Sequence, residues 1–221
     1  MSSTPASSAQ PPALRLAVLG DSIAWGQGAA TPDDRLAPRL TGALRARGLT
    51  VADRVFAEPG ARSRDLGAQV DRALTWRPHV ALVVIGANDV THREPVQAAA
   101  AALEQAVRRL RGSGSEVVVA PAPDLGAVPH VPAALRQVVR AASETLRRRQ
   151  ADAVVAAGGR VADADQRASQ AFGSDPALFS ADRFHPSSAG YAVIADAVLP
   201  ALDLAVRSAA RAQGPAGPQL P

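Results

Sequence analysis

The stretch VALVVIGAND, residues 80–89, decides the fold class of this chain. Its first six residues are all apolar, which predicts a strand buried on both faces, as in a parallel sheet that helices cover on both sides. Gly86 marks the end of that strand, and the polar residues Asn88 and Asp89 follow it directly. We therefore expect an α/β fold in which polar groups gather where the strands end.

Four other apolar runs alternate with helical patterns along the rest of the chain. The additional strands are expected at residues 14–19, 51–57, 117–120 and 160–164, and the helices at 32–47, 64–76, 95–110, 132–157 and 186–210. The first of these helices is expected to have Thr31 as its N-cap, Pro32 at its first position and Gly48 at its end. This alternation implies right-handed crossovers and a five-stranded parallel sheet between two layers of helices. Ligands of such sheets bind at the carboxyl ends of the strands, so the chemistry is expected there.

The composition fits one folded domain with irregular ends. Hydrophobic residues make up 47% of the 221, which is enough for a sizeable core. We expect the domain at residues 14–211 and disordered segments at 1–13 and 212–221, which are rich in Ser, Pro, Ala, Gly and Gln. The absence of cysteine excludes disulfides, a thiol nucleophile and cysteine-ligated metals. Aromatic residues make up only 3%, which argues against a binding surface of stacked rings.

The charge pattern excludes several classes of partner. All 24 basic residues are arginine, but they are scattered among 20 acidic residues and form no dense basic stripe, so we expect no nucleic-acid partner. Residues 1–13 lack the basic and apolar regions of a secretory signal, and no apolar run approaches the roughly 18 residues of a membrane span. We expect a cytoplasmic protein without a membrane span. No metal-binding motif is present, so we expect neither a metal nor a cofactor, and the sequence leaves the oligomeric state open.

Three positions that directly follow predicted strands are chemically suggestive. They are Ser22, Gly60 and Asn88. Taken singly, Ser22 is better explained as a helix cap or turn residue and Asn88 as an Asx-turn, and Gly60 is explained equally well as a turn glycine. A serine hydroxyl at the rim of a sheet is also a potential nucleophile. The Asn88 amide and the backbone N–H groups of Ser22 and Gly60 are donors of the kind that an oxyanion hole requires.

A carboxylate and a histidine precede the last predicted helix, in the sequence DRFHP at residues 182–186. The proline biases His185 to an extended conformation at the start of the helix. Asp182 can then accept a hydrogen bond from the Nδ1–H of His185 and leave Nε2 free as a general base. A lone histidine at this position would instead be interpreted as a helix-cap or surface residue. Together with Ser22, the pair supplies the groups for acyl transfer through a serine ester.

The sequence resembles the SGNH (GDSL-type) hydrolase family in four segments. These are GDSI at 20–23, EPGAR at 58–62, GAND at 86–89 and DRFHPSSAGY at 182–191, and the resemblance spans about residues 14–206. It implies a flavodoxin-like three-layer α/β/α sandwich, with Ser22 as nucleophile, His185 as base and Asp182 orienting the base. It also implies an oxyanion hole formed by Ser22, Gly60 and Asn88. Two departures are Ile23 in place of the leucine of the family name, and the unusual Glu58-Pro59 before Gly60.

We therefore expect a serine esterase that hydrolyses a small-molecule or lipid ester, with short acyl chains favoured by the scarcity of aromatics and the modest loops. Two alternatives stay open. One is an acyltransferase that uses the same site with a sugar or alcohol acceptor, and the other is a non-catalytic module that binds a phosphate or nucleotide. Trp25 is expected to touch the substrate. His79 is expected to be structural, whereas the roles of His92 and His130 stay open.

Overall fold

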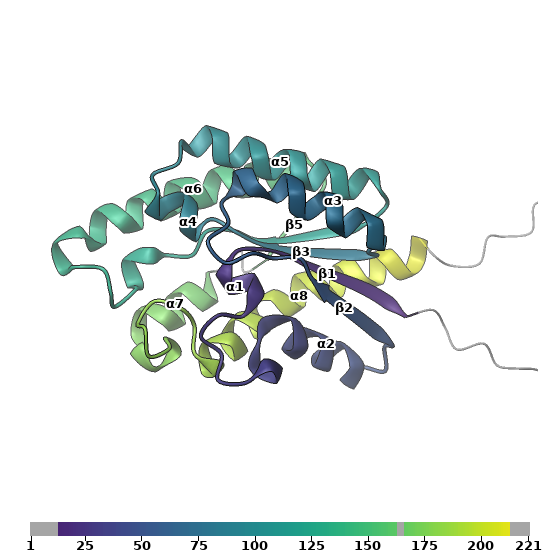
Figure 1. Ribbon diagram of the computed structural model, residues 1–221, viewed down its shortest axis with the longest axis horizontal. Coiled ribbons are helices and arrows are strands. Elements are labelled where there is room, and N and C mark those ends of the chain that lie inside the picture. The colour runs from purple at the N-terminus through teal and green to yellow at the C-terminus, as the bar shows by residue number, and fades with distance from the viewer. Residues whose placement is uncertain (1–12, 163–165, 213–221) are drawn as a thin grey trace, which may run out of the picture.

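The computed structural model describes residues 13–162 and 166–212, which form a three-layer α/β/α sandwich (Figure 1). Five strands form one parallel sheet in the order β2-β1-β3-β4-β5. Their bounds are β1 Leu14–Gly20, β2 Val51–Val55, β3 Val80–Val84, β4 Glu116–Ala120 and β5 Arg160–Val161. This architecture confirms the expected fold class.

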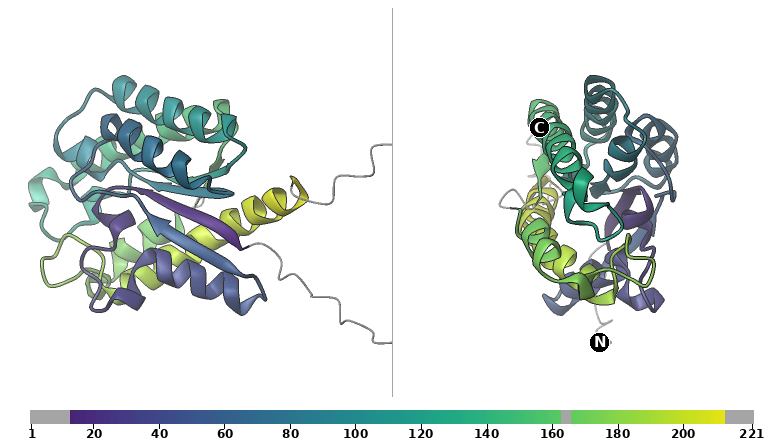
Figure 2. Two further views of the ribbon diagram at one scale, coloured as in Figure 1. Left: turned by 45° about the vertical axis from the view of Figure 1, so that its right-hand side comes forward. Right: turned by 90° about the vertical axis from the view of Figure 1, so that its left-hand side faces the viewer.

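Helices cover both faces of the sheet (Figures 1 and 2). One face carries α3 (Leu66–Trp76), α5 (Val96–Gly112) and α6 (Arg136–Ala156), and the other carries α2 (Leu36–Ala46) and α8 (Ser188–Ala212). Three short helices lie near the carboxyl ends of the strands: α1 (Ser22–Trp25), α4 (Ala87–Thr91) and α7 (Arg167–Ser174). The sequence analysis did not predict these three.

Strand β3 lies at the centre of the sheet, and all of its residues are buried. Successive side chains of a strand point to opposite faces. Leu82 accordingly joins the core that contains Leu40 of α2 and Leu202 of α8, whereas Val83 joins the core that contains Leu66 of α3. Because both faces are packed, the strand requires the unbroken apolar run that its sequence shows.

The helix expected at residues 32–47 is interrupted. A short 3₁₀ turn spans Pro32–Asp34, Arg35 is extended with ψ 160°, and α2 begins only at Leu36. The reason is Pro38, which would break a hydrogen bond in the interior of a longer helix. With the start at Leu36, the missing N–H of Pro38 falls in the first turn, where it has no intrahelical partner to lose.

The expected boundaries differ at several other places. Strand β2 ends at Val55 rather than at residue 57, and the helix expected from 132 begins as the 3₁₀ turn Ala133–Leu135 before α6. Ala212, placed in the expected C-terminal segment, is the last residue of α8. The remainder of the two segments that were expected to be disordered, at 1–12 and 213–221, lies outside the described residues, as do residues 163–164 of the predicted fifth strand.

Helix α8 is long and apolar enough to cross a membrane by length and composition alone, with 44% of its most apolar 18-residue window buried. In the fold it covers one face of the sheet beside α2. Tyr191, Val198 and Leu202 pack into the core between the sheet and α2.

The turn after β1 is shaped by the close approach of β3. Gly20 has φ 132°, and a Cβ on this residue would lie 1.8 Å from the carbonyl oxygen of Val84. The same oxygen accepts a hydrogen bond from the backbone N–H of Asp21 at 3.1 Å. Only glycine permits this approach, so Gly20 determines where Asp21 and Ser22 leave the sheet.

Gly20→Ala is expected to destabilise the protein by about 3 kcal/mol or more, because the positive φ and the clash with Val84 both oppose a side chain. Gly42→Ala is the matched control, since it lies within α2 with nothing within 4 Å of an added Cβ. The control is expected to stabilise by about 0.5–1 kcal/mol. Urea unfolding measures both changes, and equal stability of Gly20→Ala and the wild type would contradict the packing described here.

Candidate active site

Ser22 is the first residue of α1, directly after β1. Asp21 caps this helix, because its Oδ1 accepts a hydrogen bond from the backbone N–H of Ile23 at 2.9 Å. Gly26, with φ 95°, ends the helix one turn later. Ser22 is only 6% exposed. The serine is therefore held at a defined point at the carboxyl edge of the sheet.

His185 lies in the loop before α8, 163 residues from Ser22 in the sequence. Its Nε2 is 3.1 Å from the Oγ of Ser22, and its Nδ1 is 2.6 Å from the Oδ2 of Asp182. The structure thus brings together the three residues that the sequence singled out, in one continuous chain of hydrogen bonds.

The loop that carries His185 is held by its own backbone. The N–H of Ser180 donates to the carbonyl oxygen of His185 at 2.7 Å, and Arg183 takes a left-handed conformation with φ 59°. Phe179 and Pro186 form an isolated antiparallel bridge across the base of the loop. These contacts close the loop into a compact turn that fixes the position of the imidazole.

Asp182 is held in its ionised form. Burial alone would raise the pKa of its carboxyl group. Hydrogen bonds from the His185 ring, from the backbone N–H groups of His185 and Phe184 and from the Ser180 hydroxyl outweigh burial and hold that pKa well below its usual range. An ionised carboxylate at this position can orient the imidazole and stabilise positive charge on it.

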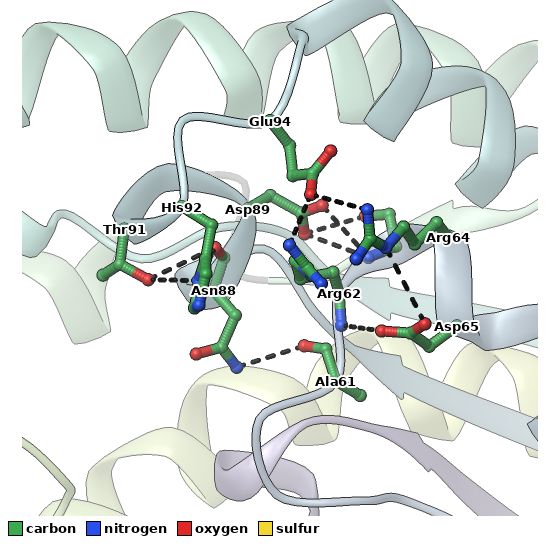
Figure 3. Close-up of polar contacts among 10 residues, drawn as sticks. Ala61, Arg62, Arg64, Asp65, Asn88, Asp89, Thr91, His92 and Glu94 are labelled. Atoms are coloured by element: carbon green, nitrogen blue, oxygen red, sulfur yellow. Dashed lines mark hydrogen bonds and ion pairs between the residues drawn. The ribbon is translucent and has the colours of Figure 1, made fainter.

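Asn88 and the turn at Gly60 meet at the same edge of the sheet. The loop after β2 reaches this edge because the N–H of Glu58 donates to the carbonyl oxygen of Gly20 at 3.1 Å. Gly60 is exposed with φ 83°, and the Asn88 side-chain amide donates to the carbonyl oxygen of the next residue, Ala61, at 3.1 Å (Figure 3). A side-chain amide has two N–H donors, so Asn88 retains a second one for a ligand.

Polar contacts hold the loop after β2 against α4 and against Glu94, in the segment between α4 and α5 (Figure 3). The Asp89 carboxylate accepts hydrogen bonds from the backbone N–H and the hydroxyl of Ser63 at 3.0 to 3.2 Å. The Glu94 carboxylate lies between Arg62 and Arg64, at 2.7 and 3.2 Å. These contacts fix the Gly60 turn relative to Asn88.

Two buried glutamines brace the strand ends, and sequence analysis missed both. Gln69 accepts a hydrogen bond from the N–H of Gly20 at 2.7 Å and donates to its carbonyl oxygen at 2.9 Å. Gln150 accepts one from the N–H of Ala122 at 2.8 Å. Both side chains are fully buried. The one sequence signal that could have predicted each of them is a polar residue on the apolar face of a helix.

Trp25 lies at the end of α1, with 38% of its surface exposed. The guanidinium of Arg35 lies 4.4 Å from its ring centroid, a cation–π contact. The structure gives Trp25 this partner, and its contact with a substrate stays a prediction.

The remaining histidines lie outside the hydrogen-bonded chain. His79 accepts a hydrogen bond from the backbone N–H of Arg15 at 3.1 Å, which gives it a structural contact between β1 and β3. The Nδ1 of His92 is 2.9 Å from the carbonyl oxygen of Asn88, and His130 is exposed. Among the described residues, no group of three or more His, Asp or Glu side chains is arranged to hold a metal ion.

The profile of the GDSL-like lipase/acylhydrolase family, the SGNH hydrolases, matches residues 18–193, a range that contains Ser22, Asn88, Asp182 and His185. The chain belongs to this family. It is also 37% identical, over 198 residues, to a GDSL-like esterase of Mycobacterium tuberculosis. That match covers 86% of this chain and 62% of the relative, so the chain spans less than two thirds of the relative's length.

Solved structures share the fold of this SGNH hydrolase at low sequence identity. A catalytic mutant of an acetylxylan esterase from Geobacillus stearothermophilus matches with a TM-score of 0.68 and 19% identity, covering 86% of this chain and 94% of that one. The structure of TesA matches with a TM-score of 0.73 and 18% identity, covering 86% of this chain and 98% of that one. The psychrotrophic esterase EstA from Pseudoalteromonas sp. matches with a TM-score of 0.69 and 15% identity, covering 87% of this chain and 98% of that one. These similarities confirm the SGNH hydrolase fold.

A pair of buried carboxyl groups lies behind Ser22 in this SGNH hydrolase. Asp21 and Asp89 are 1% and 2% exposed. Burial raises the pKa of Asp21 to about 7, with the Ile23 N–H opposing the shift and the charge of Asp89 adding to it. Burial also raises the pKa of Asp89, against the hydrogen bonds from Ser63. In the described part of the chain, the Oδ2 of Asp21 has no hydrogen-bond partner.

Ionisation of Asp21 is expected to lower the stability of the protein between about pH 4 and pH 7. The pKa of its carboxyl is about 7 in the folded chain, against an ordinary value of 3.8, so the folded state binds this proton more strongly. The free energy of unfolding therefore falls as the pH rises through this interval, and the loss is complete above it. Asp21→Asn removes the titration and keeps an acceptor for the Ile23 N–H.

We expect the stability difference between Asp21→Asn and the wild type to shift in favour of the variant as the pH rises from 4 to 8. Urea unfolding at several pH values measures it. A difference that does not change with pH would show that Asp21 does not titrate in this range.

Proposed function

We propose that this protein is a serine esterase that hydrolyses carboxylic esters through an acyl-enzyme on Ser22. The observation that carries the proposal is the chain of hydrogen bonds from the Ser22 Oγ through His185 to Asp182, at 3.1 and 2.6 Å. A serine hydroxyl is a weak nucleophile until a base accepts its proton, and here the base lies in contact with it. Membership of the lipase/acylhydrolase family and the similarity to a GDSL-like esterase support the same reaction.

In the proposed mechanism, the Nε2 of His185 accepts the Ser22 proton as the Oγ bonds to the ester carbonyl carbon. Asp182 keeps the other ring proton on Nδ1 and stabilises the imidazolium. The protonated Nε2 then gives its proton to the alcohol oxygen as the carbon–oxygen bond breaks. Water then attacks the acyl-enzyme as it loses a proton to the same nitrogen. The Nε2 passes this proton to the Ser22 Oγ as the bond to the acyl group breaks, which releases the acid and restores both residues.

The tetrahedral intermediate carries negative charge on the former carbonyl oxygen. We assign the stabilisation of this charge to the backbone N–H groups of Ser22 and Gly60 and to the Asn88 amide. The clamp between Asp89 and Ser63 supports the assignment, because donors that are held in advance need no reorganisation during the reaction.

The other two candidate functions predict different products. An acyltransferase would form the same acyl-enzyme, and an added alcohol or sugar would then appear as a new ester. A non-catalytic module would form no acyl-enzyme, and a phosphate or nucleotide would raise its melting temperature. The hydrogen bond between Ser22 and His185 favours the catalytic functions.

Ser22→Ala is expected to abolish ester hydrolysis and acyl-enzyme formation, because no other hydroxyl is hydrogen-bonded to His185 in the described part of the chain. Hydrolysis of p-nitrophenyl acetate and mass spectrometry of the quenched enzyme measure the two effects. Ser113→Ala is the control. Ser113 lies between the end of α5 and the start of β4, at the edge of the sheet opposite to the site. A Ser22→Ala enzyme as active as this control would refute the assignment.

Asn88→Ala is expected to lower kcat by about 100- to 1,000-fold, the usual loss for one oxyanion donor. KM should change little, because the donor acts mainly on the charge of the transition state. Thr91→Ala, on the exposed side of the same short helix, is the control. A loss confined to KM would instead place Asn88 in ground-state binding.

A further inference from the structure

An apolar cavity opens beside Ser22 and His185 and extends into the protein. Six of its lining residues come from the strand ends and from α8: Val84, Ala120, Ala162, Ile194, Ala197 and Val198. Phe172, Phe179 and Phe184 also line it, so three of the four phenylalanines in the sequence gather here. The centres of water-sized molecules can occupy about 110 Å³ of this cavity, so the space out to its walls is larger.

The cavity reaches far from the reacting atoms. Ser22 follows β1 and Ala162 follows β5, which lie three strands apart in the sheet. Since neighbouring strands are about 4.8 Å apart, this distance is about 14 Å. Ala197 lies nine residues beyond Ser188, the first residue of α8, which is a similar distance of about 13–14 Å along the helix.

A hydrocarbon chain fits these dimensions and these walls. An extended chain advances about 1.2 Å per bond, so about 14 Å accommodates roughly ten to twelve bonds. The charged residues Asp124 and Arg147 lie at the border with a second, polar hollow that Arg140 and Glu144 also line. Arg140 donates to the Asp124 carboxylate at 2.8 Å, and the Nη1 of Arg147 has no hydrogen-bond partner among the described residues. This border is therefore polar, whereas the walls that β3, β4 and α8 contribute are apolar.

The two-step reaction determines which part of the ester this cavity holds. The alcohol leaves first, and water must then take its place beside the Nε2 of His185. Water enters an apolar cavity poorly, so the alcohol must depart on the open side of the site. The chain that stays bonded to Ser22 is the one that the cavity can hold throughout.

We propose that this cavity binds the acyl chain of the substrate, and that the preferred esters carry medium-length chains of about eight to twelve carbons. This inference rests on the proposed function of Ser22. It replaces the short chains expected from the sequence, because aliphatic side chains and three clustered phenylalanines build a long apolar wall in a chain that has few aromatics.

A series of p-nitrophenyl esters from acetate to palmitate tests the chain length. Each buried methylene should raise kcat/KM by about fourfold, so we expect a rise from acetate through octanoate that ends at about ten to twelve carbons. A decline from acetate onward overturns this inference and leaves the esterase intact. Absence of activity and of acyl-enzyme with every ester overturns the proposed function itself.

Ala197→Leu tests the position of the chain, because the larger side chain fills the part of the cavity remote from Ser22. We expect kcat/KM for decanoate to fall by about 15-fold, the loss of two buried methylenes, and that for acetate to stay within about twofold. Ala192→Leu is the matched control, since it adds the same volume to α8 at a residue that does not line the cavity. Ile194→Phe, at a half-buried position, provides a second block should Ala197→Leu not fold.

A second series, acetate esters of alcohols of increasing length, distinguishes the two parts of the substrate. The proposal expects the wild type and Ala197→Leu to rank these alcohols identically. A shorter preferred alcohol in Ala197→Leu would show that the cavity holds the alcohol. That result, or an equal loss with every acyl chain in both blocking variants, overturns the proposal.

Discussion

The close approach of β1 and β3 at their carboxyl ends governs the position of every group in the site. Gly20 lies against the Val84 carbonyl oxygen, which also accepts the N–H of Asp21, and Gln69 binds both polar backbone atoms of Gly20. Backbone atoms that are packed and paired in this way cannot shift without losing buried hydrogen bonds. Ser22 therefore leaves the sheet at one point, and His185 has to meet it there from the opposite end of the chain.

The surroundings of two carboxyl groups near the reacting atoms shift their pKa values in opposite directions. Asp182, at the rim, is kept ionised by four donors, whereas burial favours the neutral form of Asp21 up to a pKa of about 7. Two carboxyl groups whose pKa values are shifted apart can take different roles in the site. An ionised Asp182 can stabilise an imidazolium, whereas Asp21 caps α1 in a neutral form below about pH 7 and in an ionised form above it.

The parts of the fold that local sequence determines were predictable, and the parts that long-range contacts determine were not. The run at 80–85 predicted the central strand because burial on both faces requires it, and the spacing of Asp182 and His185 predicted their pairing. One local signal was overlooked, since Pro38 restricts where α2 can start and the helix expected at 32–47 was therefore wrong. Helices of four or five residues, such as α1 and α4, are too short to show a periodicity. The partners of Gln69 and the cavity walls come from elements far apart in the sequence, which no local pattern reports.

Ser22 lies at a boundary between two chemically different surfaces, and this boundary orients an ester. One side carries Asn88 and the charged loop that Glu94 holds (Figure 3), and the other carries the cavity beneath α8. The reverse orientation would place the polar carbonyl among the aliphatic side chains that line most of the cavity, and the apolar chain among arginines and carboxylates. Burying an unpaired polar group is costly, so the fold discriminates against that orientation before any chemistry begins. The proposed selection of the acyl chain and the proposed stabilisation of the oxyanion therefore rest on the same arrangement of strand ends.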